Sequence, residues 1–307
     1  MYGADERSRS SADGGQAQAP AKLLDYPIRI HCLECTSSTG RACDQQPIPV
    51  APRGCVLPSA AVAPTEHALA ATAVVTGAGT GMGEAAARAL VAAGARVAFV
   101  GRTRATLEQA SRGLPADRAR IELCDVGDRQ ATDTMVARVS AELGPVDLLV
   151  CSAGTNSNPR GLGSIDPDTF DQVITINLTG VFNAMRAVLP GMRELGRGTI
   201  INISSIAGLR ATEVSGVAYS ASKHAVRSLT YTINQEERQH NIRSCVICPG
   251  ETATPILDKR PRVPSQAERE LMLQAEDVAD AVMFVARLPQ RANVPEIIMH
   301  PTKDSFI

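Results

Sequence analysis

Short apolar runs rich in β-branched residues recur along the chain from residue 71 onward, and stretches of helical length separate most of them. Runs of this kind predict buried strands, and the stretches between them predict helices. We expect seven strands, at residues 71–76, 96–100, 118–124, 146–151, 198–203, 242–247 and 294–299. Alternating strands and helices predict a doubly wound α/β fold, in which helices cover both faces of a parallel sheet.

The stretches between these runs differ in length and character. We expect helices at residues 84–94, 129–143, 167–192, from before 219 to 239, and 275–286. Residues 251–269 are rich in proline and charge and show no apolar period, so they predict a long loop near the last helix. A polar, proline-bearing loop of this kind is consistent with a lid over a binding site.

The first 70 residues differ from the rest, because they are rich in Ala, Ser, Gly, Pro and Gln and show no hydrophobic period. We interpret them as a poorly ordered extension to a single domain at residues 71–307. The extension contains Cys32 and Cys35 at a metal-ligand spacing, with Cys43 and Cys55 further on. A zinc site is the alternative, but a second closely spaced pair is missing, so we predict no metal site.

Charge and composition narrow the class of protein. The net charge is −1 and the pI is about 6.5, which gives no signal for nucleic acid or an anionic membrane. No apolar run reaches the roughly 20 residues that span a bilayer, and the amino terminus lacks the apolar core of a secretory signal. Eight cysteines without such a signal indicate thiols rather than disulfides. We expect a soluble, cytoplasmic protein.

A glycine-rich turn follows the first strand. It runs from Gly77 to Gly83, with glycine at every second position, and an Ala-rich helix comes next. Strand, glycine turn and helix in this order bind the pyrophosphate of a dinucleotide, because glycines let the backbone approach the phosphates and the helix N-terminus offers unpaired N–H groups. An ordinary glycine-rich loop is the alternative, which the flanking elements disfavour.

The end of the second strand bears on the choice of coenzyme. In a dinucleotide-binding fold an acid at this point holds the ribose 2′-hydroxyl of NAD. Here the strand ends at Gly101 and is followed by Arg102 and Arg104. A guanidinium without the acid suits a 2′-phosphate, so we predict NADP, with NAD as the alternative.

Tyr219 and Lys223 are four residues apart in a predicted helix, which places both side chains on one face. An ammonium beside a phenol favours the phenolate and lowers the tyrosine pKa from roughly 10. Such a tyrosine exchanges protons near neutral pH. Any helix can carry this spacing as a solvated pair, so the assignment depends on the other motifs.

The motifs together carry a resemblance. The glycine turn, Asn177, a serine pair ending at Ser205, and the Tyr219 and Lys223 pattern follow one another in the order found in the short-chain dehydrogenase/reductase family. The chain resembles that family over about residues 70–307. The resemblance implies one Rossmann-like domain with a seven-stranded sheet, NAD(P)-dependent oxidoreduction of a small molecule, and a homodimer or homotetramer.

The resemblance also implies roles for single residues. Tyr219 is the general acid/base, Lys223 lowers its pKa and holds the nicotinamide ribose, Ser205 binds the substrate oxygen, and Asn177 holds a water that links Lys223 to solvent. Asp125 contacts the adenine. The implied cofactor-binding residues are Gly77, Thr80, Gly81, Met82, Gly83, Arg102, Asp125, Val126, Ser152, Ala153, Gly154, Tyr219, Lys223, Pro249, Gly250, Thr252 and Thr254.

Two departures from the family pattern concern the site. Ser152 stands where the family usually has an asparagine that pins the central strands, and the interval from Ser205 to Tyr219 is one residue longer than usual. The last residues, 288–302, resemble the ending of the branch that contains NADP-dependent 3-hydroxy acid and serine dehydrogenases.

The sequence therefore predicts reversible hydride transfer between NADP(H) and a carbonyl or secondary alcohol, such as a 3-hydroxy acid or a small ketone. Three loops are expected to line the substrate pocket, 155–164, 206–217 and 251–265. They contain Arg160, Lys259, Arg260 and Arg262, which are candidate carboxylate ligands or solvated loop cations. A non-catalytic NADP-binding regulatory or scaffold protein is the alternative, which the presence of all four proton-transfer residues disfavours.

Overall fold

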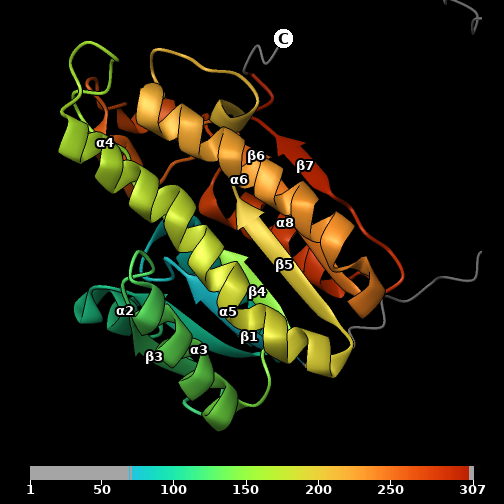
Figure 1. Ribbon diagram of the computed structural model, residues 1–307. Coiled ribbons are helices and arrows are strands. Elements are labelled where there is room, and N and C mark those ends of the chain that lie inside the picture. Colours follow the sequence, from blue (N-terminus) through green and yellow to red (C-terminus); the bar gives the residue numbers. More distant parts are fainter. Residues whose placement is uncertain (1–68, 70, 304–307) are drawn as a thin grey trace, which may run out of the picture. The chain divides into compact units, whose positions relative to one another are not determined.

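Seven parallel strands form one sheet in the order β3-β2-β1-β4-β5-β6-β7 (Figure 1). The structure is a computed structural model and describes residue 69 and residues 71–303. The strands are β1 (Thr72–Thr76), β2 (Arg96–Gly101), β3 (Ala119–Leu123), β4 (Leu148–Cys151), β5 (Gly198–Ile203), β6 (Ile242–Pro249) and β7 (Glu296–Met299). The predicted fold class is confirmed, and each strand end lies within two residues of its prediction.

Helices connect the strands. They are α1 (Gly81–Ala92), α2 (Arg104–Ala110), α3 (Arg129–Leu143), α4 (Pro167–Ile174), α5 (Gly180–Leu195), α6 (Val217–Glu236), α7 (Gln266–Glu270) and α8 (Ala275–Arg287). Four short turns complete the order, η1 (Thr175–Thr179), η2 (Ile206–Gly208), η3 (Arg238–His240) and η4 (Pro255–Lys259). Neither α2 nor the short η4 and α7 inside the loop at residues 251–269 was predicted from the sequence.

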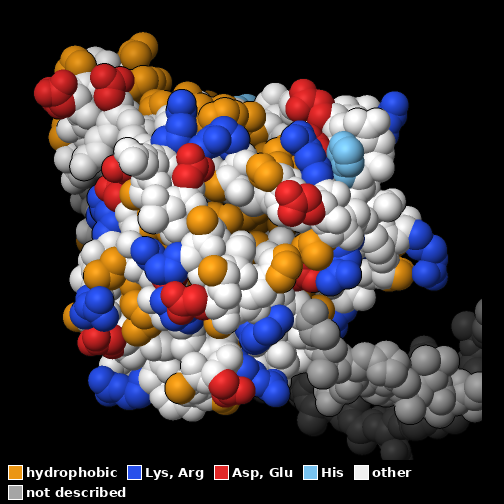
Figure 2. All heavy atoms as spheres, turned by 60° about the horizontal axis from the view of Figure 1, so that its bottom comes forward, with side chains coloured by type: hydrophobic (Ala, Val, Ile, Leu, Met, Phe, Trp, Pro, Cys, Tyr) orange, Lys and Arg blue, Asp and Glu red, His pale blue; other side chains and the backbone are white. Residues whose placement is uncertain are grey.

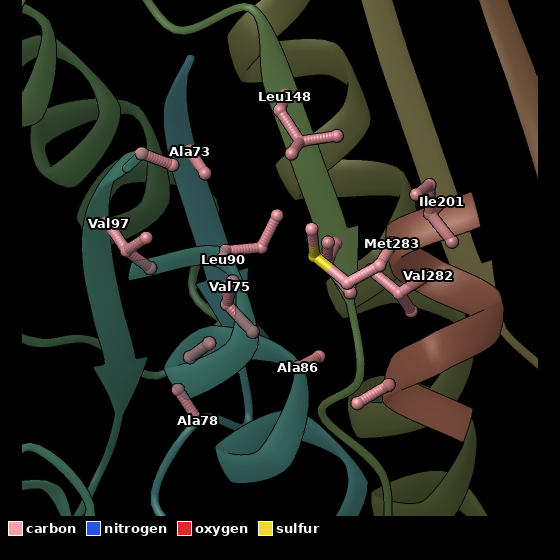
Figure 3. Packing of buried hydrophobic residues seen from close by; sticks show 14 of the residues in the cluster. Ala73, Val75, Ala78, Ala86, Leu90, Val97, Leu148, Ile201, Val282 and Met283 are labelled. Carbon is pink, nitrogen blue, oxygen red and sulfur yellow. The ribbon is translucent and has the colours of Figure 1, made fainter. Parts of the chain in front are cut away.

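Two hydrophobic layers hold the helices against the sheet. On one face α1 packs on β1 and β2 and α8 packs on β5 and β6, and Figure 3 shows Leu90 near Val75, with Val282 and Met283 near Ile201. On the other face α3, α5 and α6 cover the sheet. Both layers consist mostly of Val, Ile, Leu, Ala and Met side chains that exclude water, which is the main stabilising contribution to such a domain.

The helix predicted over residues 167–192 runs from Pro167 to Leu195 but contains a π-helical turn, η1, between α4 and α5. Regular periodicity does not reveal such a turn, and π-turns are frequent at functional sites. By length and composition this helix could cross a membrane, at a mean hydropathy of 1.3, but core helices of soluble proteins meet the same criteria. In this fold α5 packs on the sheet beside β4 and β5.

The strands β1 and β4 are neighbours in the sheet, and the chain leaves them in opposite directions. The connection after β1 leads to β2 on one side, and the connection after β4 leads to β5 on the other. In open parallel sheets, ligands bind in the crevice outside the carboxyl ends of the strands at such a point. The topology therefore places the glycine turn after β1 beside the segment after β4. On the face shown in Figure 2, acidic and basic side chains are interspersed rather than gathered by sign.

The predicted extension at residues 1–70, with Cys32, Cys35, Cys43 and Cys55, lies outside the described residues except for Leu69. The zinc alternative for these cysteines stays untested. Within residue 69 and residues 71–303, no group of three or more His, Cys, Asp or Glu side chains could hold a metal ion.

Candidate active site

The glycine turn is shaped by close backbone approaches. Gly77 has φ +68°, and a Cβ at this position would lie 2.7 Å from Ala153 N and Cα. A Cβ at Gly83 would lie 2.3 Å from Gly77 O. Only glycine permits both approaches, and the turn leads directly into the N-terminus of α1. These residues fit a dinucleotide pyrophosphate, because the cradle is backbone and the helix end is positive.

Tyr219 and Lys223 lie one turn apart on α6, as the spacing predicts. The Lys223 ammonium is 5.5 Å from the centroid of the Tyr219 ring. It donates a 2.8 Å hydrogen bond to the backbone O of Ile203, at the end of β5. The two side chains therefore meet at the carboxyl edge of the sheet.

Two cavities meet at Tyr219, and Lys223 lines one of them. The first joins Tyr219 and Lys223 to the glycine turn and to the segment after β4, and the residues that complete its lining are Gly77, Thr80, Gly81, Met82, Ser152, Gly154, Ile203, Ser204, Thr254, Pro255 and Ile256. The second has a volume of about 280 Å³ and is bounded by Tyr219, Ser205 and residues of all three predicted pocket loops. Tyr219 lines both, so the phenol stands between the nucleotide side and the loop side.

The pKa of Tyr219 differs from the expectation. Burial raises it above the ordinary value, and a hydrogen bond with Ser205 and the charges of Arg260 and Arg160 oppose that rise. The pKa therefore moves opposite to the lowering that the sequence predicts, because burial outweighs the neighbouring groups that favour the phenolate. Cations from the pocket loops, rather than the helical neighbour, favour the phenolate.

Lys223 is itself perturbed. Its side chain is 5% exposed, and burial lowers its pKa to about 8. Burial disfavours the charged ammonium, since water solvates it better than the protein interior does. The residue can therefore change its protonation state close to neutral pH.

Asn177 lies in the π-turn η1 and is fully buried. Its side-chain O accepts from Thr155 N at 2.8 Å, while its side-chain N donates to Thr155 O at 2.9 Å and to Ser222 Oγ at 3.2 Å. The amide thus holds the segment after β4 against α6, next to Gly154, where an added Cβ would lie 3.7 Å from Lys223 Nζ. This contact with Thr155 was not anticipated from the sequence.

The two serines after β5 have different partners. Ser204 is buried and its hydroxyl donates to Lys223 O at 2.9 Å, which ties β5 to α6. Ser205 is half-buried, accepts from Ala207 N at 3.1 Å, and hydrogen-bonds Tyr219. Of the pair, Ser205 is the one whose hydroxyl reaches the phenol.

The substitution at Ser152 is accommodated through β1. The hydroxyl of Thr76 accepts from Ser152 N at 3.2 Å and from Ala153 N at 3.3 Å, and Ser152 N also donates to Thr76 O. The ends of β1 and β4 are therefore joined without an asparagine side chain. The serine hydroxyl also lies close to Gly83, because a Cβ added at that glycine would lie only 3.2 Å from Ser152 Oγ.

Other predicted cofactor residues lie apart from the first cavity. Arg102 and Asp125 follow β2 and β3 and face each other at 3.7 Å, both about half-exposed. Val126 O accepts from Asn183 at 2.9 Å, which packs this segment on α5. The residues Pro249, Gly250 and Thr252 line the second cavity rather than the first.

The four candidate loop cations separate into two groups. Arg160 and Arg260 line the second cavity. Lys259 does not, because its ammonium donates to Thr155 Oγ1 at 2.8 Å, and the exposed Arg262 pairs with Glu268 at 2.6 Å. The sequence could not separate the two groups, since the difference is set by contacts with other loops.

Comparison with known families and proteins agrees with this geometry. The model of the family described as short chain dehydrogenase matches residues 71–263. An uncharacterized oxidoreductase of Staphylococcus aureus (strain MW2) is 32% identical over 229 residues, which cover 75% of this chain and 96% of that protein. Glycine betaine reductase ATRR of Emericella nidulans is 34% identical over 239 residues, but this chain spans only 18% of its length.

A solved structure is similar throughout the described fold. The closed form of a serine dehydrogenase complexed with NADP+ matches with a TM-score of 0.71 and 30% sequence identity. The match covers 76% of this chain and 96% of that one. At 30% identity the two proteins are similar in sequence as well as in the arrangement of their helices and strands.

Proposed function

The chain belongs to the short-chain dehydrogenase family and is a short-chain dehydrogenase/reductase enzyme, and we propose that it uses NADP(H) to interconvert a carbonyl and a secondary alcohol. The observation that carries the proposal is the position of Tyr219 between two cavities, with Lys223 beside it in the cavity at the glycine turn. One cavity begins at the glycine turn, and the other is closed by loops. A coenzyme on the first side and a substrate on the second would meet at the phenol.

The bound nicotinamide would supply or accept the hydride. Tyr219 would donate a proton to the carbonyl oxygen during reduction and accept it during oxidation, and Ser205 would donate a hydrogen bond to the same oxygen. Lys223 would hold the coenzyme ribose, and Asn177 would keep the segment after β4 in place behind it. The glycine turn would hold the pyrophosphate with its backbone N–H groups.

The preference for NADP is supported by the end of β2. Gly101 provides no carboxylate, and Arg102 is half-exposed beside Asp125 at 3.7 Å. The similar serine dehydrogenase was solved with NADP+. We expect Arg102→Gln to lower kcat/KM for NADPH about tenfold, the loss of one charge-assisted contact, and to leave the value for NADH unchanged. A paired steady-state assay with both coenzymes measures this, and an equal loss with both would contradict the preference.

For the substrate we propose a 3-hydroxy acid or its keto form, with a small ketone as the second class. The similarity to a serine dehydrogenase and the presence of Arg160 and Arg260 in the second cavity support an acid. An assay of coenzyme oxidation over β-keto acids, aldehydes and cyclic ketones distinguishes the classes. Turnover of none of them would reopen the non-catalytic alternative, for which the comparisons give no support.

Tyr219→Phe tests the mechanism directly. We expect it to keep coenzyme binding and to lose turnover by at least ~10²-fold, because it removes the proton donor. Tyr231→Phe is the matched control, since Tyr231 lies three turns further along α6 and its hydroxyl bonds to Glu296 instead. Near-normal turnover of Tyr219→Phe would show that the assignment is wrong.

We also propose that the enzyme is a soluble cytoplasmic homodimer or homotetramer, as the family resemblance implies. Acidic and basic side chains are interspersed on the face shown in Figure 2, which is compatible with a soluble protein. Sedimentation of the purified protein measures the assembly, and a monomer at micromolar concentration would contradict it.

A further inference from the structure

Arg160 ties three segments together at the start of α6. Its backbone O accepts from Val217 N at 3.1 Å, Nη1 donates to Val214 O at 2.6 Å, and Nη2 donates to Lys259 O at 2.6 Å. Gly216 has φ +76°, and a Cβ there would lie 2.6 Å from Arg160 Cβ. Only glycine lets the arginine approach this closely, so the first turn of the helix that carries the phenol is built around it.

Among the residues that the structure describes, the charge of Arg160 has no carboxylate counter-ion. The residue is 6% exposed, and no carboxylate within residues 71–303 forms an ion pair with it. Its Nε is buried and makes no hydrogen bond. An unpaired buried cation is costly for folding, since neither water nor an anion compensates it. Burial and the neighbouring Arg260 accordingly lower the pKa of Arg160, whereas the negative form of Tyr219 raises it.

The charged groups around the phenol come from several elements. Lys223 is on the same helix, 5.5 Å from the ring centroid. Arg160 and Arg260 come from two loops, and Arg260 is paired with Glu251 at 2.7 Å. Arg210 lines the same cavity from a third loop. Arg160 is the most buried of these three arginines, and its backbone O contacts the start of α6 at Val217.

We propose that Arg160 is a positioning residue for Tyr219, which fixes the first turn of α6 and places a buried, unpaired positive charge in the pocket wall that favours the phenolate. The inference rests on the proposed function, in which Tyr219 exchanges the proton. The proposal adds Arg160, a cation, to the four residues that the family resemblance assigns to proton transfer. The reciprocal influence of the two groups on each other's pKa agrees with the geometry.

Two variants separate charge from shape. Arg160→Lys keeps the positive charge, Arg160→Gln removes it, and both retain a donor for a loop carbonyl. We expect the ascending, acid-side limb of the pH profile of alcohol oxidation, along which the phenolate that accepts the proton forms, to move to higher pH by about one unit in Arg160→Gln and to stay in place in Arg160→Lys. If both variants lose rate while the limb stays in place, Arg160 has only a structural role and the proposal is wrong.

A second readout does not require turnover. The ultraviolet absorbance of the phenolate is titrated in each variant, and the same titration in a Tyr219→Phe background is subtracted. We expect the Tyr219 titration to move upward in Arg160→Gln only, and an unmoved titration overturns the proposal even if no substrate is found. Failure of the proposed function appears separately, as wild-type protein that oxidises or reduces nothing.

Arg262→Gln is the control, because that arginine is exposed and pairs with Glu268 away from the cavity. It should leave both the rate limb and the phenol titration unchanged. Circular dichroism verifies that each variant folds. If Arg160→Gln does not fold, Arg160→Ser, which leaves space for water at the loop carbonyls, replaces it with the same expected shift.

Discussion

At the scale of the residue, Lys223 is a cation that the fold removes from water. Its pKa of about 8 lies below the ordinary 10.5, so between these pH values the unfolded chain binds a proton that the folded chain does not. Stability therefore rises with pH across this window. We expect the unfolding free energy of the wild type, relative to Lys223→Met, to rise by roughly 3 kcal/mol from pH 8 to pH 10.5.

Urea unfolding of the two proteins over this pH range measures the difference and cancels the other titrating groups. A difference that does not depend on pH would mean that the ammonium is solvated in the folded protein. A lysine that is paired with an anion has a raised pKa, so its contribution to stability falls as the pH rises. The direction of the change therefore distinguishes a buried, unpaired Lys223 from a paired one.

Contacts between single residues could be predicted from the sequence where both residues lie on the same helix or strand, because their spacing then decides whether they meet. Tyr219 and Lys223 are an example, because both lie on α6. Prediction failed for the groups that tune the phenol, since Arg160 and Arg260 reach it from loops distant in sequence. It also missed the contact between Asn177 and Thr155, which depends on a helix geometry that no apolar period reveals.

At the scale of the element, the turn between β1 and α1 depends on two glycines for different reasons. Gly77 needs a positive φ, whereas Gly83 needs the absence of a side chain because Gly77 O lies against it. We expect Gly83→Ala to weaken NADPH binding at least tenfold, since the turn must open to admit the methyl group. Titration of coenzyme fluorescence measures the affinity.

Gly191 provides the matched control within a helix. It lies in α5, and a Cβ there would have no atom within 4 Å. Gly191→Ala should leave coenzyme binding unchanged and raise stability by about 0.5 to 1 kcal/mol, because alanine loses less backbone entropy. Equal coenzyme affinity in both alanine variants would contradict the steric account of the turn.

The elements themselves were largely predictable. Long apolar runs such as β5 and β6 are buried along their whole length, so their residues report burial directly. The short helix α2 was missed because only Leu107 and Ala110 of its seven residues are buried, which gives too weak a period. The helix α7 has no buried residue, and its capping box at Ser265 and Glu268 was its one local signal.

At the scale of the whole molecule, Arg243 connects the end of α8 to the sheet. From β6 its guanidinium donates to four backbone carbonyls, those of Val285, Leu288, Pro289 and Ala292, and to Thr199 Oγ1. The side chain is 6% exposed, and burial lowers its pKa. Of the four carbonyls in the last turn of α8, this guanidinium satisfies that of Val285, and its other three carbonyl partners lie in the segment that follows the helix.

We therefore expect Arg243→Met to cost roughly 3 kcal/mol of unfolding free energy, because several buried carbonyls lose their donor together. Urea unfolding measures the loss, and Arg262→Met, at an exposed position, should change stability by less than about 0.5 kcal/mol. A small effect at Arg243 would show that water replaces the guanidinium. No pattern in the sequence indicates this contact, since four of the partners are backbone carbonyls of a distant segment.

The π-turn η1 has a consequence for how the chain tolerates length changes. A turn with one additional residue rotates all that follows by about 100° relative to an uninterrupted α-helix. Deleting one residue from Thr175–Thr179 would restore the more favourable helix, yet it would swing either Asn177 away from Thr155 or the apolar stripe of α5 away from the sheet. At this point a shorter chain would form a better helix and a worse enzyme.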